Sequence, residues 1–200
     1  MVFIPTFFFV SITPGMCMTL ALSLGMTIGV RRSLWMMLGE LVGVGVVACL
    51  AVIGVAAIML QYPLLFQLLK YAGGLYLAWL GIQLWRSKGK LALSPVDAGP
   101  RHIPIKTLIS QGFITAIANP KGWAFFVALL PPFIDPNAPL FGQLAVLVSM
   151  ILVLEFSCLL LYASGGRTLS RVLQQKNKVQ LMNRIAGTLM LGVALWLALG

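Results

Sequence analysis

Long apolar segments make up most of the chain, and short polar or basic stretches separate them. Each segment has about 20 residues or more, the length that an α-helix needs to cross the hydrocarbon core of a bilayer. The segments lie at about residues 3–28, 34–60, 66–85, 107–130, 140–163 and 179–200. This pattern predicts an all-α polytopic membrane protein with six transmembrane helices, and it leaves almost nothing for a soluble domain.

The composition agrees with this prediction and narrows the possible partners. Of the 200 residues, 60% are hydrophobic and 9% are charged, whereas a soluble domain carries about 25% charged residues. The formal net charge of +10 comes from basic residues in the short loops beside the apolar segments. Such placement is typical of membrane topology rather than of a phosphate-binding face, so we expect a lipid bilayer and no nucleic acid as partner.

The basic residues are distributed unevenly among the loops. They fall in the first, third and fifth loops, at Arg31 and Arg32, in residues 86–106 and in residues 167–184. The second loop has only Lys70 at its edge, and the fourth has none. Because cytoplasmic loops carry the excess of Lys and Arg, we expect the odd loops in the cytoplasm and both termini in the periplasm.

Two of the predicted helices are interrupted, the first at Pro14-Gly15 and the fourth at Asn119-Pro120-Lys121. An interior proline removes one backbone N–H and clashes with the preceding turn, and a lysine at mid-membrane depth costs roughly 3 kcal/mol on insertion scales. In lipid, a broken helix is tolerated only where protein buries it or where it borders a wet cavity. A plain proline kink also explains the first interruption, but the two together predict a transport protein with its substrate path at the breaks.

The two halves of the chain resemble each other weakly. Residues 70–77 are similar to residues 184–191 at an offset of 114. The two interruptions, and the acids Glu40 and Glu155, recur at comparable offsets. Each match is weak by itself, but together they suggest an internal repeat of three helices.

A repeat of three helices has consequences for the architecture. We predict one transmembrane transport domain over residues 1–200, with repeats at 1–86 and 107–200 and a cytoplasmic linker at 87–106. Because three is odd, the two repeats cross the membrane in opposite directions. Inverted repeats with a pair of interrupted helices indicate a transporter site near the membrane midplane.

The residues at the interruptions suggest what the site binds. If the two broken helices face each other, the free N–H groups of their second halves favour a carboxylate, and Lys121 adds a positive charge. Glu155, together with Glu40, offers an acceptor for an ammonium group or a site for a proton. This combination suits a zwitterion such as a free amino acid. The predicted substrate-binding residues are Pro14, Gly15, Met16, Cys17, Asn119, Pro120 and Lys121, and the predicted coupling residues are Glu40 and Glu155.

Two simpler interpretations of these charges stay open. Lys121 and Glu155 also suit a structural ion pair that holds two helices together. Glu40 also suits a charge at the membrane rim, because it lies roughly 12 Å along the helix from Arg32 and a long side chain can extend toward the headgroups.

The chain resembles a known family, the LysE/RhtB amino-acid exporters, over nearly its whole length. The resemblance rests on Gly112-Phe113, Asn119-Pro120-Lys121, Phe125-Phe126, Pro131-Pro132-Phe133, Ala72-Gly73, Tyr76-Leu77, Gly81, Glu155, Asn183-Arg184 and Gly187. It implies a secondary transporter of the bacterial inner membrane that exports amino acids or closely related small metabolites by proton antiport. The direction of transport comes from the resemblance alone.

The chain also departs from the family pattern. Members usually read Pro-Gly-Pro-Asn at the first interruption, whereas residues 14–17 here read Pro-Gly-Met-Cys. Cys17 stands in the place of the asparagine, so the site lacks a side-chain amide that could form a hydrogen bond with a substrate. The substrate class therefore stays open. Many members also carry an acid at the position of Val44, and here Glu40 lies one turn earlier on the same helix face.

The sulfur side chains of Met16, Cys17 and Met18 allow two alternative functions. Soft sulfur ligands favour ions such as Cu(I), but consecutive helical residues point about 100° apart, so a soft-metal exporter would need the helix to unwind there. A transmembrane thiol–disulfide relay among Cys17, Cys49 and Cys158 would need two of these cysteines to meet.

Enzymatic function has little support in the sequence. No Gly-x-Ser-x-Gly or His-Glu-x-x-His motif is present, so hydrolase chemistry is not indicated. We therefore expect a transporter without a cofactor, with a small-molecule substrate and protons as partners. The transported metabolite, the coupling stoichiometry and the oligomeric state, including a homo-oligomer, stay open at this point.

Overall fold

The computed structural model describes residues 3–87, 103–130, 133–135 and 138–199. Most of the predicted linker at 87–106 therefore lies outside the described residues. No strand occurs in the described ranges, which confirms the all-α prediction for them. The helices are α1 (Phe3–Ile12), α2 (Met16–Thr27), α3 (Val30–Gln61), α4 (Pro63–Arg86), α5 (Ile105–Ile117), α6 (Pro120–Leu129), α7 (Leu140–Gln174) and α8 (Lys176–Leu199).

Both predicted helix interruptions are present. Helices α1 and α2 meet at an angle of 56° across residues 13–15. Helix α5 ends at Ile117 and α6 begins at Pro120. Proline is favoured at the first position of a helix, because a backbone N–H there would have no hydrogen-bond partner within the helix. The side chain of Asn119 caps α6 by accepting a hydrogen bond from the backbone N–H of Lys121, at 3.2 Å.

Two of the described helices are long and apolar enough to cross a membrane by themselves, α3 over Val30–Gly54 and α7 over Leu140–Gly166. The bent pair of α1 and α2 makes a third crossing if the two helices count as one broken span. The assignment of six spans stays a prediction.

The fifth apolar segment was expected to end at about residue 163, but α7 continues to Gln174. The helix is interrupted at Gly166, whose φ of 44° lies in the left-handed region. Glycine adopts that region without the steric cost that a Cβ would bring. The chain therefore changes direction at Gly166 and continues as a second, more polar helical stretch.

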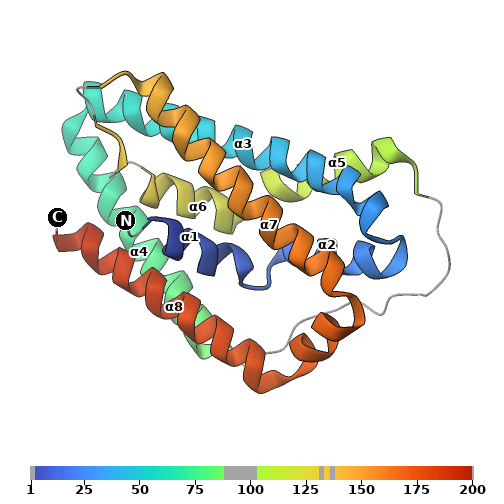
Figure 1. The fold of residues 1–200 in the computed structure, drawn as a ribbon. Helices are drawn as coiled ribbons and strands as arrows, with labels where there is room; N and C mark the ends of the chain where they lie inside the picture. Colours follow the sequence, from blue (N-terminus) through green and yellow to red (C-terminus); the bar gives the residue numbers. More distant parts are fainter. Residues whose placement is uncertain (1–2, 88–102, 131–132, 136–137, 200) are drawn as a thin grey trace.

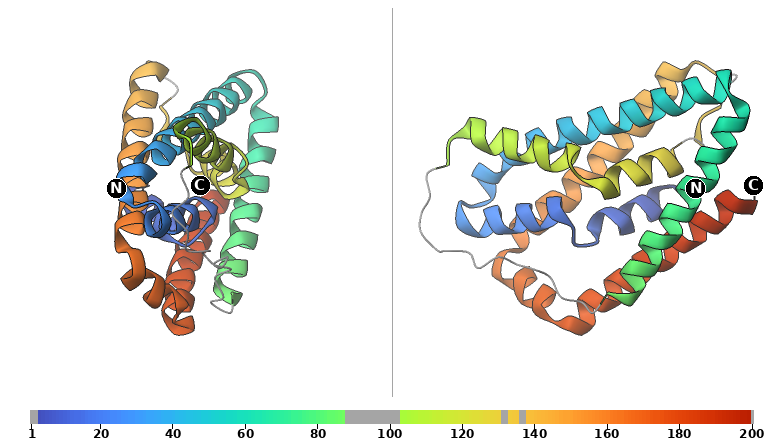
Figure 2. Two further views of the ribbon diagram at one scale, coloured as in Figure 1. Left: turned by 90° about the vertical axis from the view of Figure 1, so that its right-hand side faces the viewer. Right: turned by 180° about the vertical axis from the view of Figure 1, so that it is seen from behind.

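The helices form an elongated bundle (Figures 1 and 2). The most extensive contacts pair α3 with α5, α4 with α8, and α2 with α7, and α3 also packs against α7. Helix α1 precedes the first break and α6 follows the second. In both figures these two short helices lie next to each other inside the bundle. This arrangement brings the two breaks together near the middle of the molecule.

Glycines allow the closest helix contacts. A Cβ added at Gly112 of α5 would lie 2.0 Å from the backbone oxygen of Met36 in α3, and one added at Gly39 would lie 2.0 Å from the backbone oxygen of Ile109. Between α4 and α8, a Cβ at Gly187 would lie 2.6 Å from the backbone oxygen of Gly81. Small residues that let helix backbones approach are typical of packing within membranes.

The start of α1, the end of α8 and the α3–α4 connection lie at the same end of the bundle (Figure 1). The α2–α3 connection lies at the opposite end (Figure 1), and Arg31 and Arg32 belong to the first turn of α3 that follows it. The side of the membrane on which each terminus lies stays a prediction.

We predict that Gly112→Ala destabilises the protein, because the new Cβ would collide with backbone atoms rather than with a flexible side chain. Overpacking of this kind costs about 1–3 kcal/mol, and each kcal/mol lowers the melting temperature of a chain of this size by roughly 2–4 °C. The measurement is thermal unfolding of purified protein in detergent. The matched control is Gly54→Ala in α3, where a Cβ meets nothing within 4 Å; an equal effect of both variants would contradict the packing interpretation.

Candidate functional site

A cavity of about 50 Å³ lies where the two helix breaks meet. By volume, such a space holds a few water molecules. Of the predicted site residues, seven line it: Gly15, Met16, Cys17, Asn119, Lys121, Glu40 and Glu155. Pro14 and Pro120 do not line the cavity, although they cause the breaks that form it.

The cavity lies where two buried apolar clusters meet. Phe7, Val47 and Phe125 belong to one cluster, and Cys17 and Met18 belong to the other, and all five line the cavity. The polar groups of the site therefore form a layer between apolar regions. In such surroundings a polar group without a hydrogen-bond partner is costly, so the partners of each group are informative.

Lys121 bonds to the end of α1. Its ammonium group donates to the backbone oxygen of Val10 at 2.5 Å. In an uninterrupted helix that oxygen would accept from the N–H four residues later, but residue 14 is proline and has no N–H. Lys121 supplies the missing donor, and a cation beside the C-terminus of a helix is also favoured by the helix dipole.

Two further carbonyl oxygens at the end of α1 accept hydrogen bonds from side chains. The hydroxyl of Thr13 donates to the backbone oxygen of Phe9 at 2.6 Å. The hydroxyl of Tyr162, which is buried in α7, donates to the backbone oxygen of Ile12 at 2.7 Å. Side chains of α6 and α7 therefore hold the last turn of α1 in place.

Glu155 also bonds to the last turn of α1. The hydroxyl of Ser11 donates to Oε2 of Glu155 at 2.6 Å, and both residues are buried. Lys121 and Glu155 are close enough to interact electrostatically, but their side chains bond to Val10 and Ser11 instead of to each other. In this structure the two charges are connected through α1, and the interpretation of Lys121 and Glu155 as a structural ion pair stays a prediction.

Glu40 is fully buried, with 0% of its surface exposed, and it lines the cavity. The interpretation as a charge at the membrane rim is therefore wrong. Its burial follows from the close contact of α3 with α5, since a Cβ at Gly112 would lie only 2.8 Å from the backbone nitrogen of Glu40. Cys17 and Glu155 lie beside Glu40, but neither of its carboxylate oxygens has a hydrogen-bond partner among the described residues.

The starts of α2 and α6 lie close to each other, which is the condition that the predicted zwitterion site requires. The Asn119 side-chain amide donates to Sγ of Cys17 at 3.7 Å. No side chain caps α2, and the first N–H groups of any helix lack partners within it. The site therefore combines a lysine, two buried carboxyl groups and helix N-termini, an arrangement that complements both charges of a small zwitterion.

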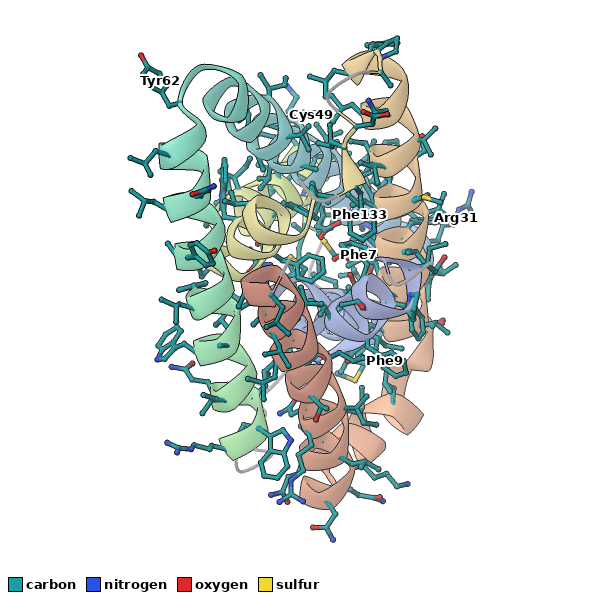
Figure 3. The ribbon with its side chains drawn as sticks, turned by 90° about the vertical axis from the view of Figure 1, so that its left-hand side faces the viewer. Phe7, Phe9, Arg31, Cys49, Tyr62 and Phe133 are labelled. Atoms are coloured by element: carbon teal, nitrogen blue, oxygen red, sulfur yellow. The ribbon has the colours of Figure 1, made fainter. Side chains whose placement is uncertain are left out.

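An apolar wall, which the sequence analysis did not identify, completes the cavity. The ring of Phe7 lies 5.6 Å from that of Phe125 and 6.1 Å from that of Phe126, between centroids. Val44 and Val47 of α3 line the same cavity. Viewed from the end of the bundle where α1 begins, Phe7 lies near the centre (Figure 3).

Sequence reasoning also missed Ser11 and Tyr162. Tyr162 lies seven residues after Glu155, two turns along α7 and so on the same face. That spacing is a usable signal. Ser11 gave no signal, because its role depends on α7 passing beside the end of α1.

Comparison with known proteins gives a consistent result. The family model described as LysE type translocator matches residues 8–200. The chain is 30% identical to an uncharacterised membrane protein of Vibrio cholerae, over 94% of this chain and 90% of the relative. It is also 30% identical to a leucine efflux protein of Enterobacter sp., over 96% of this chain and 90% of the relative. A homoserine/homoserine lactone efflux protein of Salmonella typhimurium is 27% identical over 94% of this chain and 90% of the relative.

No solved structure matches the chain significantly. The family match covers nearly the whole sequence, and the relatives align over most of their own length. The resemblance noted from the sequence is thus confirmed. The chain is a multi-pass membrane protein, and it belongs to the LysE type translocator family.

Proposed function

We propose that this protein exports amino acids, or closely related small zwitterions, across the bacterial inner membrane. The observation that carries the proposal is the cavity between two helix breaks, which is lined by Lys121, Glu40 and Glu155. Relatives named as leucine and homoserine efflux proteins support both the class of substrate and the direction of transport. The residues bind and move a substrate, and no bond of it is broken.

Lys121 is the proposed ligand of the substrate carboxylate. In the structure its ammonium group bonds to the backbone oxygen of Val10. A carboxylate carries a full charge and forms a stronger hydrogen bond with an ammonium group than a neutral carbonyl does, and the N–H groups at the start of α2, which no side chain caps, add donors. A bound substrate would thus take Lys121 from Val10 and release the end of α1, which links substrate binding to movement of a half-helix.

Glu155 is the proposed site of proton coupling. Its carboxylate accepts from Ser11 at the end of α1, and Lys121 of α6 and Glu40 of α3 are the charged groups that act on it. Protonation would turn one acceptor oxygen of Glu155 into a donor and weaken the bond from Ser11. Exchange of a proton for substrate would therefore act on the same turn of α1 as Lys121, which is the arrangement that antiport needs.

The helix contacts support the proposed inverted repeat of residues 1–86 and 107–200. The first broken pair, α1 and α2, packs on α7, just as the second pair, α5 and α6, packs on α3. Helix α8 contacts α1 and α4 contacts α6, whereas α4 and α8 contact each other. At the level of whole broken pairs, exchanging the two halves reproduces these contacts, which supports two related three-helix units. The match does not hold helix by helix, because in chain order α1 corresponds to α5 and α6 to α2.

Neither alternative use of the sulfur side chains is supported. Helix α2 is regular from Met16 onward, and Met16 is 47% exposed whereas Cys17 and Met18 are buried. Consecutive side chains of a regular helix point about 100° apart, and the described residues contain no group of three or more His, Cys, Asp or Glu that could hold a metal ion. Cys17, Cys49 and Cys158 are free thiols, and the named relatives are efflux proteins.

The topology of six spans with both termini in the periplasm is tested by reporter fusions. Fusions after Lys90 and Arg171 should score as cytoplasmic, because both residues belong to basic stretches between predicted spans. A fusion after Pro136 and one at the C-terminus should score as periplasmic. A C-terminal reporter in the cytoplasm would contradict the six-span topology.

We predict that Lys121→Ala abolishes export while the protein still inserts into the membrane. Loss of one partner of a buried, hydrogen-bonded charge pair weakens binding by at least about 30-fold. Lys121→Arg should be impaired as well, since the planar guanidinium does not replace a compact ammonium group. Export of radiolabelled leucine from preloaded cells is the measurement, and Lys106→Ala, on the exposed start of α5, is the matched control.

A purely structural role for Lys121 predicts a different result. In that case Lys121→Ala lowers protein abundance, and the double variant Lys121→Met with Glu155→Leu restores both abundance and transport because it replaces two buried charges by apolar groups. Recovery of transport in the double variant would exclude Lys121 as a substrate ligand.

We predict that Glu155→Gln keeps substrate exchange but loses acceleration by a pH gradient. Glutamine can still accept the hydrogen bond from Ser11, but it cannot take up or release a proton in this pH range. Leucine flux in proteoliposomes, with and without an imposed pH gradient, is the measurement, and Asp135→Asn at an exposed position is the control. An unchanged response to the gradient in Glu155→Gln would remove Glu155 from the coupling role.

A further inference from the structure

The two acids of the site differ in what they bond. Glu155 accepts a hydrogen bond from Ser11, whereas the fully buried carboxylate of Glu40 has no partner on either oxygen among the described residues. A buried carboxylate that lacks donors is strongly unfavourable. Glu40 nevertheless lines the cavity, so a ligand that enters the cavity can supply the donors.

Glu40 lies on a different helix from Lys121, and the two reach the same cavity. Glu40 belongs to α3 and Lys121 to the start of α6, and these helices are in contact. One supplies a negative and the other a positive group. A zwitterion placed between α3 and α6 would meet an opposite charge at each of its own charged groups.

Glu40 also shares a helix face with the apolar wall. Val44 and Val47 follow it by four and seven residues, the spacing of side chains on one face of a helix, and all three line the cavity. Val47 lies roughly 10 Å along the helix axis from Glu40. A ligand with its charged end at Glu40 would therefore place its side chain against apolar residues.

We propose that Glu40 binds the ammonium group of the substrate, and that the site therefore selects α-amino acids with a free ammonium group and an apolar side chain. This assignment rests on the proposed function and deepens it. An ammonium group has three donors and no acceptor, so it matches a carboxyl group whose two oxygens accept no hydrogen bond from the described residues, although Cys17 and Glu155 lie beside it. Glu155, which is engaged with α1, is left to carry the proton.

A role of Glu40 in carrying a proton, with no contact to substrate, is the competing assignment. It predicts that substrates with and without an ammonium group are affected alike by a change at Glu40. The ammonium-ligand assignment predicts that only substrates with an ammonium group are affected. Leucine and 2-hydroxy-4-methylpentanoate distinguish the two, because they differ only in bearing an ammonium or a hydroxyl group.

The experiment measures binding of both compounds to purified full-length protein by calorimetry in lipid nanodiscs. Wild-type protein should prefer leucine. Glu40→Gln should weaken leucine binding by at least about 30-fold and leave binding of the hydroxy acid unchanged or improved, so the preference is lost. Glu155→Gln, the matched control at the other acid, should keep the preference.

A Glu40→Gln variant that binds leucine as wild type does, or that loses both compounds equally while remaining folded, would overturn the assignment. If Glu40→Gln does not accumulate, Glu40→Asp replaces it: a shorter carboxylate should weaken leucine binding and still favour leucine over the hydroxy acid, and loss of this preference would overturn the assignment. Wild-type protein that binds neither compound would overturn the selection of an apolar side chain, and the assignment with it, whereas the proposed function would be overturned only if the protein exports no amino acid.

Discussion

The hydrogen bond from Lys121 to the backbone oxygen of Val10 connects most features of this structure. Pro14 removes the N–H that would otherwise satisfy that oxygen, so α1 ends with an acceptor that the helix itself cannot serve. The lysine that the sequence places at the second break, and that would be costly alone in a membrane, donates to it. The first break leaves the oxygen of Val10 without a donor, and the second break carries a lysine that needs an acceptor. Their hydrogen bond requires the two broken helices to lie together.

The cavity follows from this constraint. Two breaks in contact put polar backbone and side-chain groups between two apolar clusters, where only internal partners or a ligand can satisfy them. Three hydrogen bonds hold the last turn of α1: Lys121 and Tyr162 donate to it, and Glu155 accepts from it. A substrate or a proton that binds these three side chains would compete with α1 for them. Movement of α1 would therefore be coupled to the occupancy of the site by ordinary competition for hydrogen bonds.

The parts of the structure that obey local rules could be predicted from the sequence. Pro14 interrupts a helix whatever surrounds it, and Lys121 in an apolar segment must find a partner. What could not be predicted was the identity of that partner, because Val10 is one of many backbone carbonyls and only the packing of α1 beside α6 selects it. The burial of Glu40 was equally undetermined, since it depends on how closely α5 approaches at Gly112.

The central claim is that substrate carboxylate replaces Val10 as the partner of Lys121. Solid-state NMR measures this exchange directly, as the distance between the ¹³C-labelled carboxylate of leucine and the ¹⁵N-labelled side chain of Lys121 in lipid bilayers, with the signal assigned by its loss in Lys121→Met. The account predicts a distance within about 4 Å, the range of a direct ion pair, together with loss of the coupling between Lys121 and the carbonyl carbon of Val10. Bound leucine without coupling to Lys121, and with the Val10 contact retained, would contradict it.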